Sequence, residues 1–232
     1  MLDQASLLEK PVPSLAEPAA EASRPSRQEA EAAVRTLIRW GGDDPGREGL
    51  QATPARVVRA YEEWLGGYRL DPDHILSRTF DEVGGYDDIV LLRGIPVQSL
   101  CEHHMAAIRG VAHVAYLPAR RVVGISKLGR LVDAYSRRLQ IQERLTAEIA
   151  GTLERVLQPR GVAVVIEATH ACMTTRGIHQ QGVSMVTRRL LGEFREPRGR
   201  RDILAMLSSV GNLAAVDASD WYQEAHDHAH LE

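Results

Sequence analysis

The order in which strand-like and helix-like segments follow one another limits the fold of this chain most. Segments rich in Val, Ile and Leu, bounded by Gly and Pro, predict strands at 88–95, 108–117, 121–125, 161–168 and 183–194. Two segments with helical spacing, 126–138 and 141–157, separate the first three strands from the last two. Because strands group around a helical pair and do not alternate strictly with helices, the pattern predicts an α+β fold with an antiparallel sheet.

The N-terminal part of the chain carries a helical pattern instead. Apolar residues at helical spacing predict a helix from about residue 28 to 40, and a second helix is predicted with Thr53 as its N-cap and Pro54 at its first position. We expect these helices to form a packing layer, and the Ala-, Pro- and Glu-rich start of the chain to be a mobile tail. The predicted division is a tail at 1–27, a helical segment at 28–84, the main domain at 85–207 and an extension at 208–232.

Composition excludes several classes of protein. The 232 residues carry 28 basic and 31 acidic side chains, and this net charge of −3 argues against a general nucleic-acid-binding surface. No apolar run is long enough to span a membrane, and the N-terminus lacks the basic start and apolar stretch of a signal peptide. We therefore expect a cytoplasmic enzyme or binding protein with no membrane partner.

Both cysteines of the chain lie close to histidines and shortly after predicted strands. Cys101 opens the run Cys-Glu-His-His, and Cys172 lies two residues after His170. Zinc takes Cys and His ligands tetrahedrally, and a catalytic zinc keeps one position open, so Cys101, His104 and Cys172 would supply three ligands. Buried thiols, or a disulfide, which a cytoplasmic setting disfavours, would explain the same cysteines, so spacing alone leaves metal binding open.

Two histidines would lie beside such a metal without binding it. They are His103 and His170. Histidine carries protons near neutral pH, and two of them flanking one metal favour a catalytic role. A lone histidine more often has a structural role, which is our interpretation of the remaining histidines.

The segment 124–130 indicates an anion site at the start of a helix. A predicted strand ends here and a helix begins at Ser126, so free backbone N–H groups and the helix dipole favour a negative charge. Lys127 and Arg130 share a helix face, and Lys127 is one of two lysines in a chain with 26 arginines. A triphosphate is therefore a candidate ligand, although a solvated helix face would explain the same residues.

Two weaker features concern bases and nucleic acid. Gln142 and Glu143 place an amide beside a carboxylate, which can read the donor edge of guanine or can simply cap the helix. The Arg-rich stretch 188–201 would bind RNA in a salt-dependent way, but it has few aromatic residues, and a solvated face or subunit contact is the favoured interpretation.

Together these segments resemble the GTP cyclohydrolase I family. The matching text is REGLQATPARV at 47–57, SLCEHHM at 99–105, GVAHVAYLP at 110–118, VVGISKLGRLVDAYSRRLQIQERLT at 122–146 and GVAVVIEATHACMTTRG at 161–177. Several motifs in fixed order over roughly 28–205 make the resemblance specific. It implies the tunnelling fold, in which pentameric rings pair into a homodecamer and active sites form between subunits.

The resemblance also implies a reaction and a set of site residues. The reaction is zinc-dependent hydrolysis of GTP at guanine C8, which releases formate and forms 7,8-dihydroneopterin triphosphate, the first step of pteridine and tetrahydrofolate biosynthesis. The implied residues are Cys101, His104 and Cys172 for Zn²⁺, His103 and His170 for catalysis, Gln142 and Glu143 for guanine, and Arg56, Ser126, Lys127, Arg130 and Arg176 for the triphosphate.

Three other functions remain to be weighed against this one. A catalytically silent homologue would bind nucleotide or pterin without turnover, and a partial-reaction homologue would stop at a formamide or make a cyclic phosphate. A zinc base deaminase is disfavoured because the sequence lacks the pair of motifs His-x-Glu and Pro-Cys-x-x-Cys.

Overall fold

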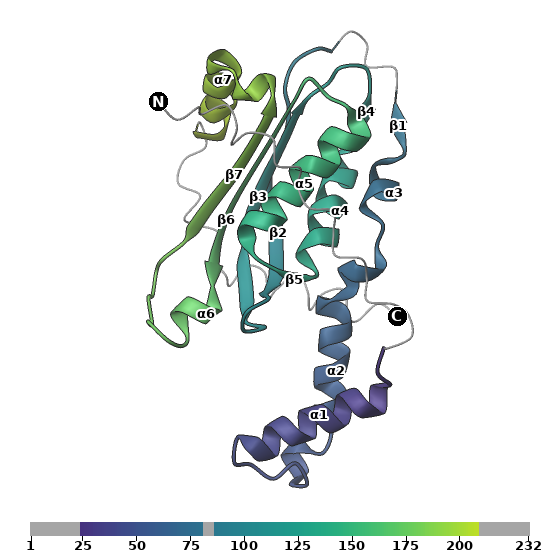
Figure 1. Cartoon of the computed structure of the whole chain (residues 1–232), viewed down its shortest axis with the longest axis vertical. Helices are drawn as coiled ribbons and strands as arrows, with labels where there is room; N and C mark the ends of the chain where they lie inside the picture. Colours follow the sequence, from purple (N-terminus) through teal and green to yellow (C-terminus); the bar gives the residue numbers. More distant parts are fainter. Residues whose placement is uncertain (1–23, 81–85, 209–232) are drawn as a thin grey trace, which may run out of the picture.

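The computed structural model describes residues 24–80 and 86–208, and in them a curved sheet carries two helices on one face (Figure 1). The strands are β1 (Thr79–Phe80), β2 (Val90–Cys101), β3 (Ala107–Leu117), β4 (Val122–Val123), β5 (Leu139–Gln140), β6 (Gly161–His170) and β7 (Met185–Gly192). The helices are α1 (Arg27–Trp40), α2 (Thr53–Trp64), α3 (Pro72–Leu76), α4 (Ile125–Ser136), α5 (Gln142–Leu157), α6 (Ala171–Thr174) and α7 (Pro197–Ser208), with 3₁₀ turns η3 (Glu48–Leu50), η4 (Gly66–Arg69) and η5 (Glu193–Arg195).

The main sheet is antiparallel along its long strands. Its order in the described residues is β5-β2-β3-β6-β7, and β5 alone pairs in parallel, beside the end of β2. The register sets Leu100 opposite Ala107 and Ile108 opposite His170. The end of β2, the start of β3 and the end of β6 therefore lie at one end of the sheet.

The helical pair α4 and α5 covers one face of this sheet and forms the main core. Leu128, Leu131, Leu145, Ile149 and Leu153 are fully buried there. Burial of each such side chain contributes about 1.5–3 kcal/mol, so the pair is held chiefly by its apolar stripe. The predicted α+β class, with an antiparallel sheet around a helical pair, is confirmed.

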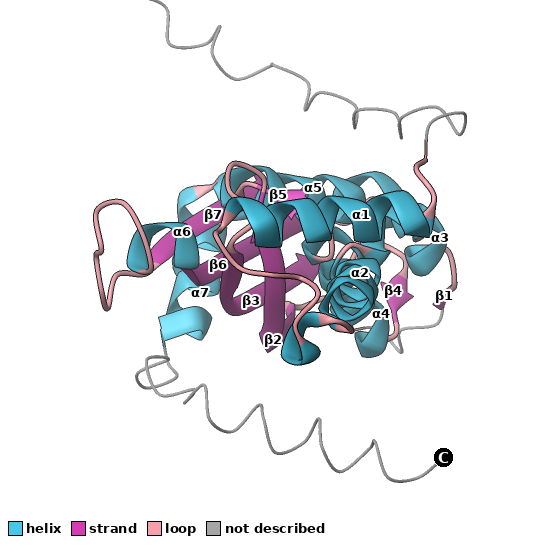
Figure 2. Cartoon of the chain, turned by 90° about the horizontal axis from the view of Figure 1, so that it is seen from below, coloured by secondary structure: helices cyan, strands magenta, loops and turns pink. Residues whose placement is uncertain are grey.

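The N-terminal helices project away from the sheet (Figure 1), and in the view from below they lie in front of it (Figure 2). Ser26 and Glu29 form a capping box at the start of α1, and no residue of α1 is buried. Leu37 and Trp40 are 65% and 87% exposed, and Trp64 of α2 is 47% exposed. The helical layer thus carries apolar surface that residues 24–80 and 86–208 do not cover.

Several predicted boundaries need correction. Thr53 is the first helical residue of α2 and not its N-cap, because the preceding Ala52 already has helical backbone angles and takes the cap position. The strand predicted at 121–125 is only Val122–Val123, and α4 begins one residue before the predicted Ser126. The sequence pattern misses the short elements α3, α6 and β5, which are too brief to show a period.

The predicted ends of the chain fall largely outside the described residues. The tail at 1–27 overlaps them only at 24–27, and the extension at 208–232 only at residue 208. The division at 84/85 lies in the gap between the two described ranges, so the domain boundaries stay predictions. Among the helices of the described ranges, none has the length and apolar character needed to cross a bilayer.

We predict that Gly110→Ala strongly destabilises the protein, because β3 and β6 approach closely at this glycine. A Cβ at Gly110 would lie 2.0 Å from the carbonyl oxygen of Glu167 and 2.5 Å from Cα of Ala168. Such overpacking costs about 1–3 kcal/mol or more. The measurement is urea unfolding at fixed protein concentration. Gly151→Ala in α5, where a Cβ meets nothing within 4 Å, is the matched control and should not lower stability; equal losses in both variants would contradict the prediction.

Candidate metal centre and nucleotide site

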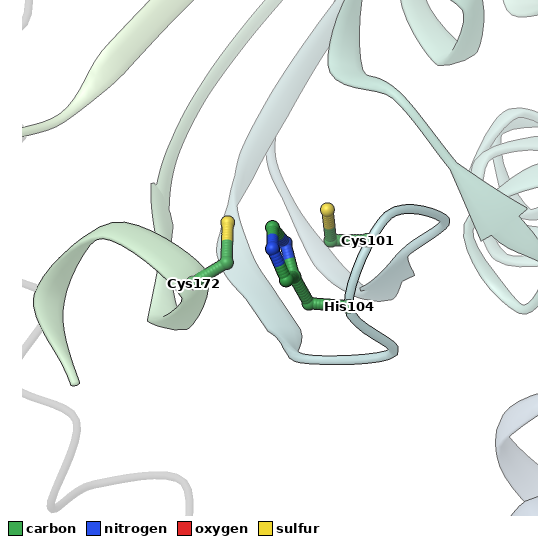
Figure 3. A group of neighbouring side chains, drawn as sticks. All are labelled: Cys101, His104 and Cys172. Carbon is green, nitrogen blue, oxygen red and sulfur yellow. The ribbon is translucent and has the colours of Figure 1, made fainter. Parts of the chain in front are cut away.

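Three side chains from two separate parts of the sequence meet at one end of the sheet (Figure 3). Cys101 ends β2, His104 lies in the turn that follows, and Cys172 lies in α6, directly after β6. Their ligand atoms all lie within 4.8 Å of one another. Both cysteines are free thiols, so the structure does not contain the alternative disulfide.

The electrostatic surroundings of this group are cationic on one side. Nη1 of Arg176 donates a hydrogen bond to Nε2 of His104 over 2.9 Å. Burial raises the pKa of the Cys172 thiol, and the hydrogen bond with Cys101 raises it further. Arg176, predicted to contact triphosphate, therefore lies beside the Cys-His-Cys group.

The loop that carries two of these ligands is tied to α5. The carboxylate of Glu102 forms an ion pair with Arg144, which also donates to the side chain of Gln140. Gln140 in turn donates to the buried carboxylate of Glu148 over 2.8 Å. Sequence reasoning missed this network because Glu102 and Arg144 lie 42 residues apart and neither belongs to a periodic motif.

The two predicted catalytic histidines flank the group. Nδ1 of His103 lies 3.7 Å from Sγ of Cys101, in the exposed turn. His170 ends β6 and is half-buried, and its Nε2 lies 2.8 Å from Oε1 of Gln142. Burial lowers the pKa of His170, while the nearby carboxylate of Glu143 acts in the opposite direction.

Gln142 and Glu143 differ sharply in their surroundings although they are neighbours. Both lie in the first turn of α5, beside His170. Gln142 is 1% exposed, whereas Glu143 is exposed to solvent. Of the two, only Glu143 has a side chain that a substrate can reach from solvent.

The predicted triphosphate residues of α4 lie toward the opposite end of the sheet. Their helix begins beside β4, where the backbone N–H of Val123 donates to the hydroxyl of Tyr116 near the far end of β3. It ends near Cys101, whose strand partner is Gln140. The twelve residues of α4 span about 18 Å, and Ser126 and Lys127 lie in its first turn. One chain therefore does not bring these residues to its own Cys-His-Cys group.

Arg56 is likewise separate from the group within this chain. It lies exposed on α2, in the projecting helical layer. In the described ranges it forms no hydrogen bond or ion pair with a site residue. Of the predicted site residues, the structure thus brings together Cys101, His103, His104, Gln142, Glu143, His170, Cys172 and Arg176.

Comparison with known proteins decides the family. A model of the family described as GTP cyclohydrolase I matches residues 30–208. The GTP cyclohydrolase 1 of Maricaulis maris (strain MCS10) is 59% identical over 180 residues, which cover 78% of this chain and 88% of that protein. The GTP cyclohydrolase 1 of Allorhizobium ampelinum (strain ATCC BAA-846 / DSM 112012 / S4) is 58% identical over 175 residues, 75% of this chain and 87% of that protein.

The chain belongs to the GTP cyclohydrolase I family. The family predicted from the sequence is confirmed, and the curved sheet with its helical pair is consistent with the tunnelling fold of GTP cyclohydrolase I. A solved structure, apo archaeosine synthase QueF-Like, matches at 20% identity over 45% of this chain and 93% of its own, with a TM-score of 0.38. That similarity is too low to support an argument.

The Cys-His-Cys group of this family member fits a metal ion. Two thiols and one imidazole are the donor set of a catalytic zinc site with one open position. At normal zinc–ligand bond lengths, tetrahedral donors lie about 3.6–3.8 Å apart. A mutual separation within 4.8 Å therefore needs only small side-chain adjustments to hold the ion.

We predict that Cys172→Ser removes the bound metal. Loss of one of three ligands should weaken zinc affinity at least about a hundredfold, since loss of an outer hydrogen-bond partner alone costs 10–100-fold. The measurement is metal content after dialysis against a weak chelator. His74→Ala, in α3 and outside the group, is the control and should keep its metal; full metal retention by Cys172→Ser would exclude this ligand set.

We also predict that Glu148 makes stability fall as pH rises. Burial raises the pKa of this carboxyl above its unfolded value, with Gln140 and Arg144 acting against the shift. The folded state therefore holds the proton to higher pH than the unfolded state, and stability is lost from about pH 4.5 up through the folded pKa. Glu148→Gln keeps the acceptor for Gln140 and should gain stability relative to the parent protein over that range. Parallel urea-unfolding curves from pH 4 to 8 measure this; a constant difference would contradict it.

Proposed function

We propose that the protein hydrolyses GTP at C8 of guanine, with zinc as its metal, to formate and 7,8-dihydroneopterin triphosphate. The observation that carries the proposal is the convergence of Cys101, His104 and Cys172 within 4.8 Å, in a member of this family. Two histidines that bind no metal in this arrangement, His103 and His170, lie beside the group. The site thus combines a metal-binding group with candidate proton carriers.

Cys101, His104 and Cys172 would hold the zinc ion and leave one position open. Bound zinc supplies Lewis acidity, which makes water a usable nucleophile near neutral pH. A protonated imidazole of His103 or His170 donates to guanine N7 and draws electrons away from C8. The imidazole ring opens to a formamide, a second hydration releases formate, and ribose opening, rearrangement and ring closure complete the pterin.

Positioning of the substrate falls to the charged residues. The carboxylate of Glu143 is exposed beside His170 and can accept hydrogen bonds from the N1–H and 2-amino groups of guanine. Arg176 lies next to His104 and can reach a phosphate there. Such fixed charges lower the barrier mainly by orientation and electrostatic stabilisation.

We further propose that copies of this chain associate, as a homodecamer of paired pentamers in the cytoplasm, and complete each other's sites. Ser126, Lys127 and Arg130 lie toward the far end of α4 from the Cys-His-Cys group, and Arg56 lies on the projecting layer. In the assembly, these residues of a second copy would contact the triphosphate of a GTP molecule bound at the Cys-His-Cys group of the first copy. The exposed Leu37, Trp40 and Trp64 supply apolar surface for association.

The test is incubation of the zinc-loaded protein with GTP, followed by assays for formate and for the dihydropterin by mass and near-ultraviolet absorbance. Both products should form, disappear on treatment with a strong chelator and return on addition of zinc. Binding of GTP without formate would instead support the catalytically silent homologue. Formamide or cyclic phosphate as the end product would support the partial-reaction homologue.

We predict that Glu143→Gln lowers kcat/KM for GTP at least tenfold. The carboxylate accepts from both N1–H and the 2-amino group of guanine, whereas the amide has only one acceptor atom and would place its own NH₂ against one of these donors. The structural control is Glu154→Gln, an exposed position near the other end of α5, which should leave kcat/KM within twofold.

Light scattering of the same samples tests the proposed association of copies. A purely monomeric, fully active protein would refute the shared site.

A further inference from the structure

Gln142 is bound to the sheet by its amide nitrogen. Nε2 lies 3.0 Å from the carbonyl oxygen of Ile166, 2.8 Å from that of Met185 and 3.1 Å from Oγ1 of Thr187. Backbone carbonyls only accept hydrogen bonds, so the nitrogen and not the oxygen of the amide must face them. These contacts fix the side-chain orientation and join the start of α5 to β6 and β7.

The amide oxygen of Gln142 then has a defined partner. Oε1 lies 2.8 Å from Nε2 of His170, and because Oε1 only accepts, Nε2 of His170 must carry a hydrogen and donate it. This hydrogen bond sets both the plane of the imidazole and its tautomer. In the described part of the chain Nδ1 of His170 has no hydrogen-bond partner, so it is the ring nitrogen left for substrate.

An amide held in this way has no N–H left to read a base, and its oxygen is buried beside His170. Both hydrogens of Nε2 are directed at the sheet, and the Gln142 side chain is closed off from solvent at 1% exposure. Its neighbour Glu143 is exposed. The carboxylate alone can therefore reach the donor edge of guanine from this turn.

We propose that Gln142 is a positioning residue that orients His170 and presents its Nδ1 to the substrate, and that it does not contact guanine. This inference rests on the proposed function and replaces the base-reading role that the family resemblance implies for Gln142. On this proposal, Glu143 is the residue of this turn that recognises the base. Gln142 acts on the proton-transfer step by holding the imidazole of His170 in place.

The first test compares two substitutions at position 142 in the zinc-loaded protein. Gln142→Met removes the acceptor and should lower kcat at least tenfold while KM and the Kd for GTP stay within twofold. Gln142→Glu, with its carboxyl protonated among the carbonyls, keeps an acceptor for His170 and should retain kcat within about fivefold. Thr187→Val is the matched control, because it removes one sheet contact of Nε2 and leaves Oε1 in place; it should lower stability alone.

A double-mutant cycle separates positioning from general damage to the fold. If Gln142 acts through His170, Gln142→Met should cost less than twofold in the His170→Ala background. A loss that is equally large in both backgrounds would overturn the proposal. A tenfold rise in the Kd for GTP, or a changed preference for GTP over ITP in Gln142→Glu, would restore the base-reading role.

A crystal structure of zinc-loaded Gln142→Glu and wild-type protein gives a readout that does not depend on activity. The proposal expects the His170 ring in the same plane in both, and a rotated ring in Gln142→Met if that variant folds. An unmoved ring in Gln142→Met would refute positioning. Absence of formate from the wild-type protein would instead refute the proposed reaction, while the ring orientation would still test the role of Gln142.

Discussion

The hydrogen-bonded register between β3 and β6 is the constraint on which the site depends. It sets Ile108 opposite His170, and the β2–β3 pairing sets Leu100 opposite Ala107, so the three strand ends coincide. A slip of one residue would turn His170 to the other face of the sheet. The glycine at position 110 lets β3 and β6 approach closely two residues from this point. Backbone pairing, not the loops themselves, brings the two cysteines together.

Much of this arrangement could be predicted from the sequence because it depends on local pattern. Strand ends next to Cys101 and Cys172 predicted the metal group, and the apolar spacing of α5 predicted the face with Leu145, Ile149 and Leu153. Contacts across long stretches of chain could not be predicted in the same way. The pairing of Glu102 with Arg144 depends on how α5 lies against the turn that carries His104. The local spacing of apolar residues does not determine that arrangement.

Gln142 illustrates why residue type alone does not assign a role. An amide next to a carboxylate suggested two readers of one base, but burial separates them. The Gln142 side chain bonds to β6, β7 and His170, while Glu143 remains in solvent. The same side chain therefore joins the start of α5 to the sheet and contacts the imidazole of His170. Only the three-dimensional surroundings distinguish these neighbouring residues.

Under the proposed sharing of sites between copies, the path of α4 has a genetic consequence. The helix starts beside Tyr116 and ends near Cys101, so Lys127 in its first turn and the Cys-His-Cys group lie toward opposite ends of the sheet in one copy. Where copies share sites, a copy defective in α4 and a copy defective in its metal ligands damage different halves of each site. Some sites in a mixed ring then receive both intact halves. Two inactive alleles can consequently complement each other in one cell, which a site built within a single chain does not allow.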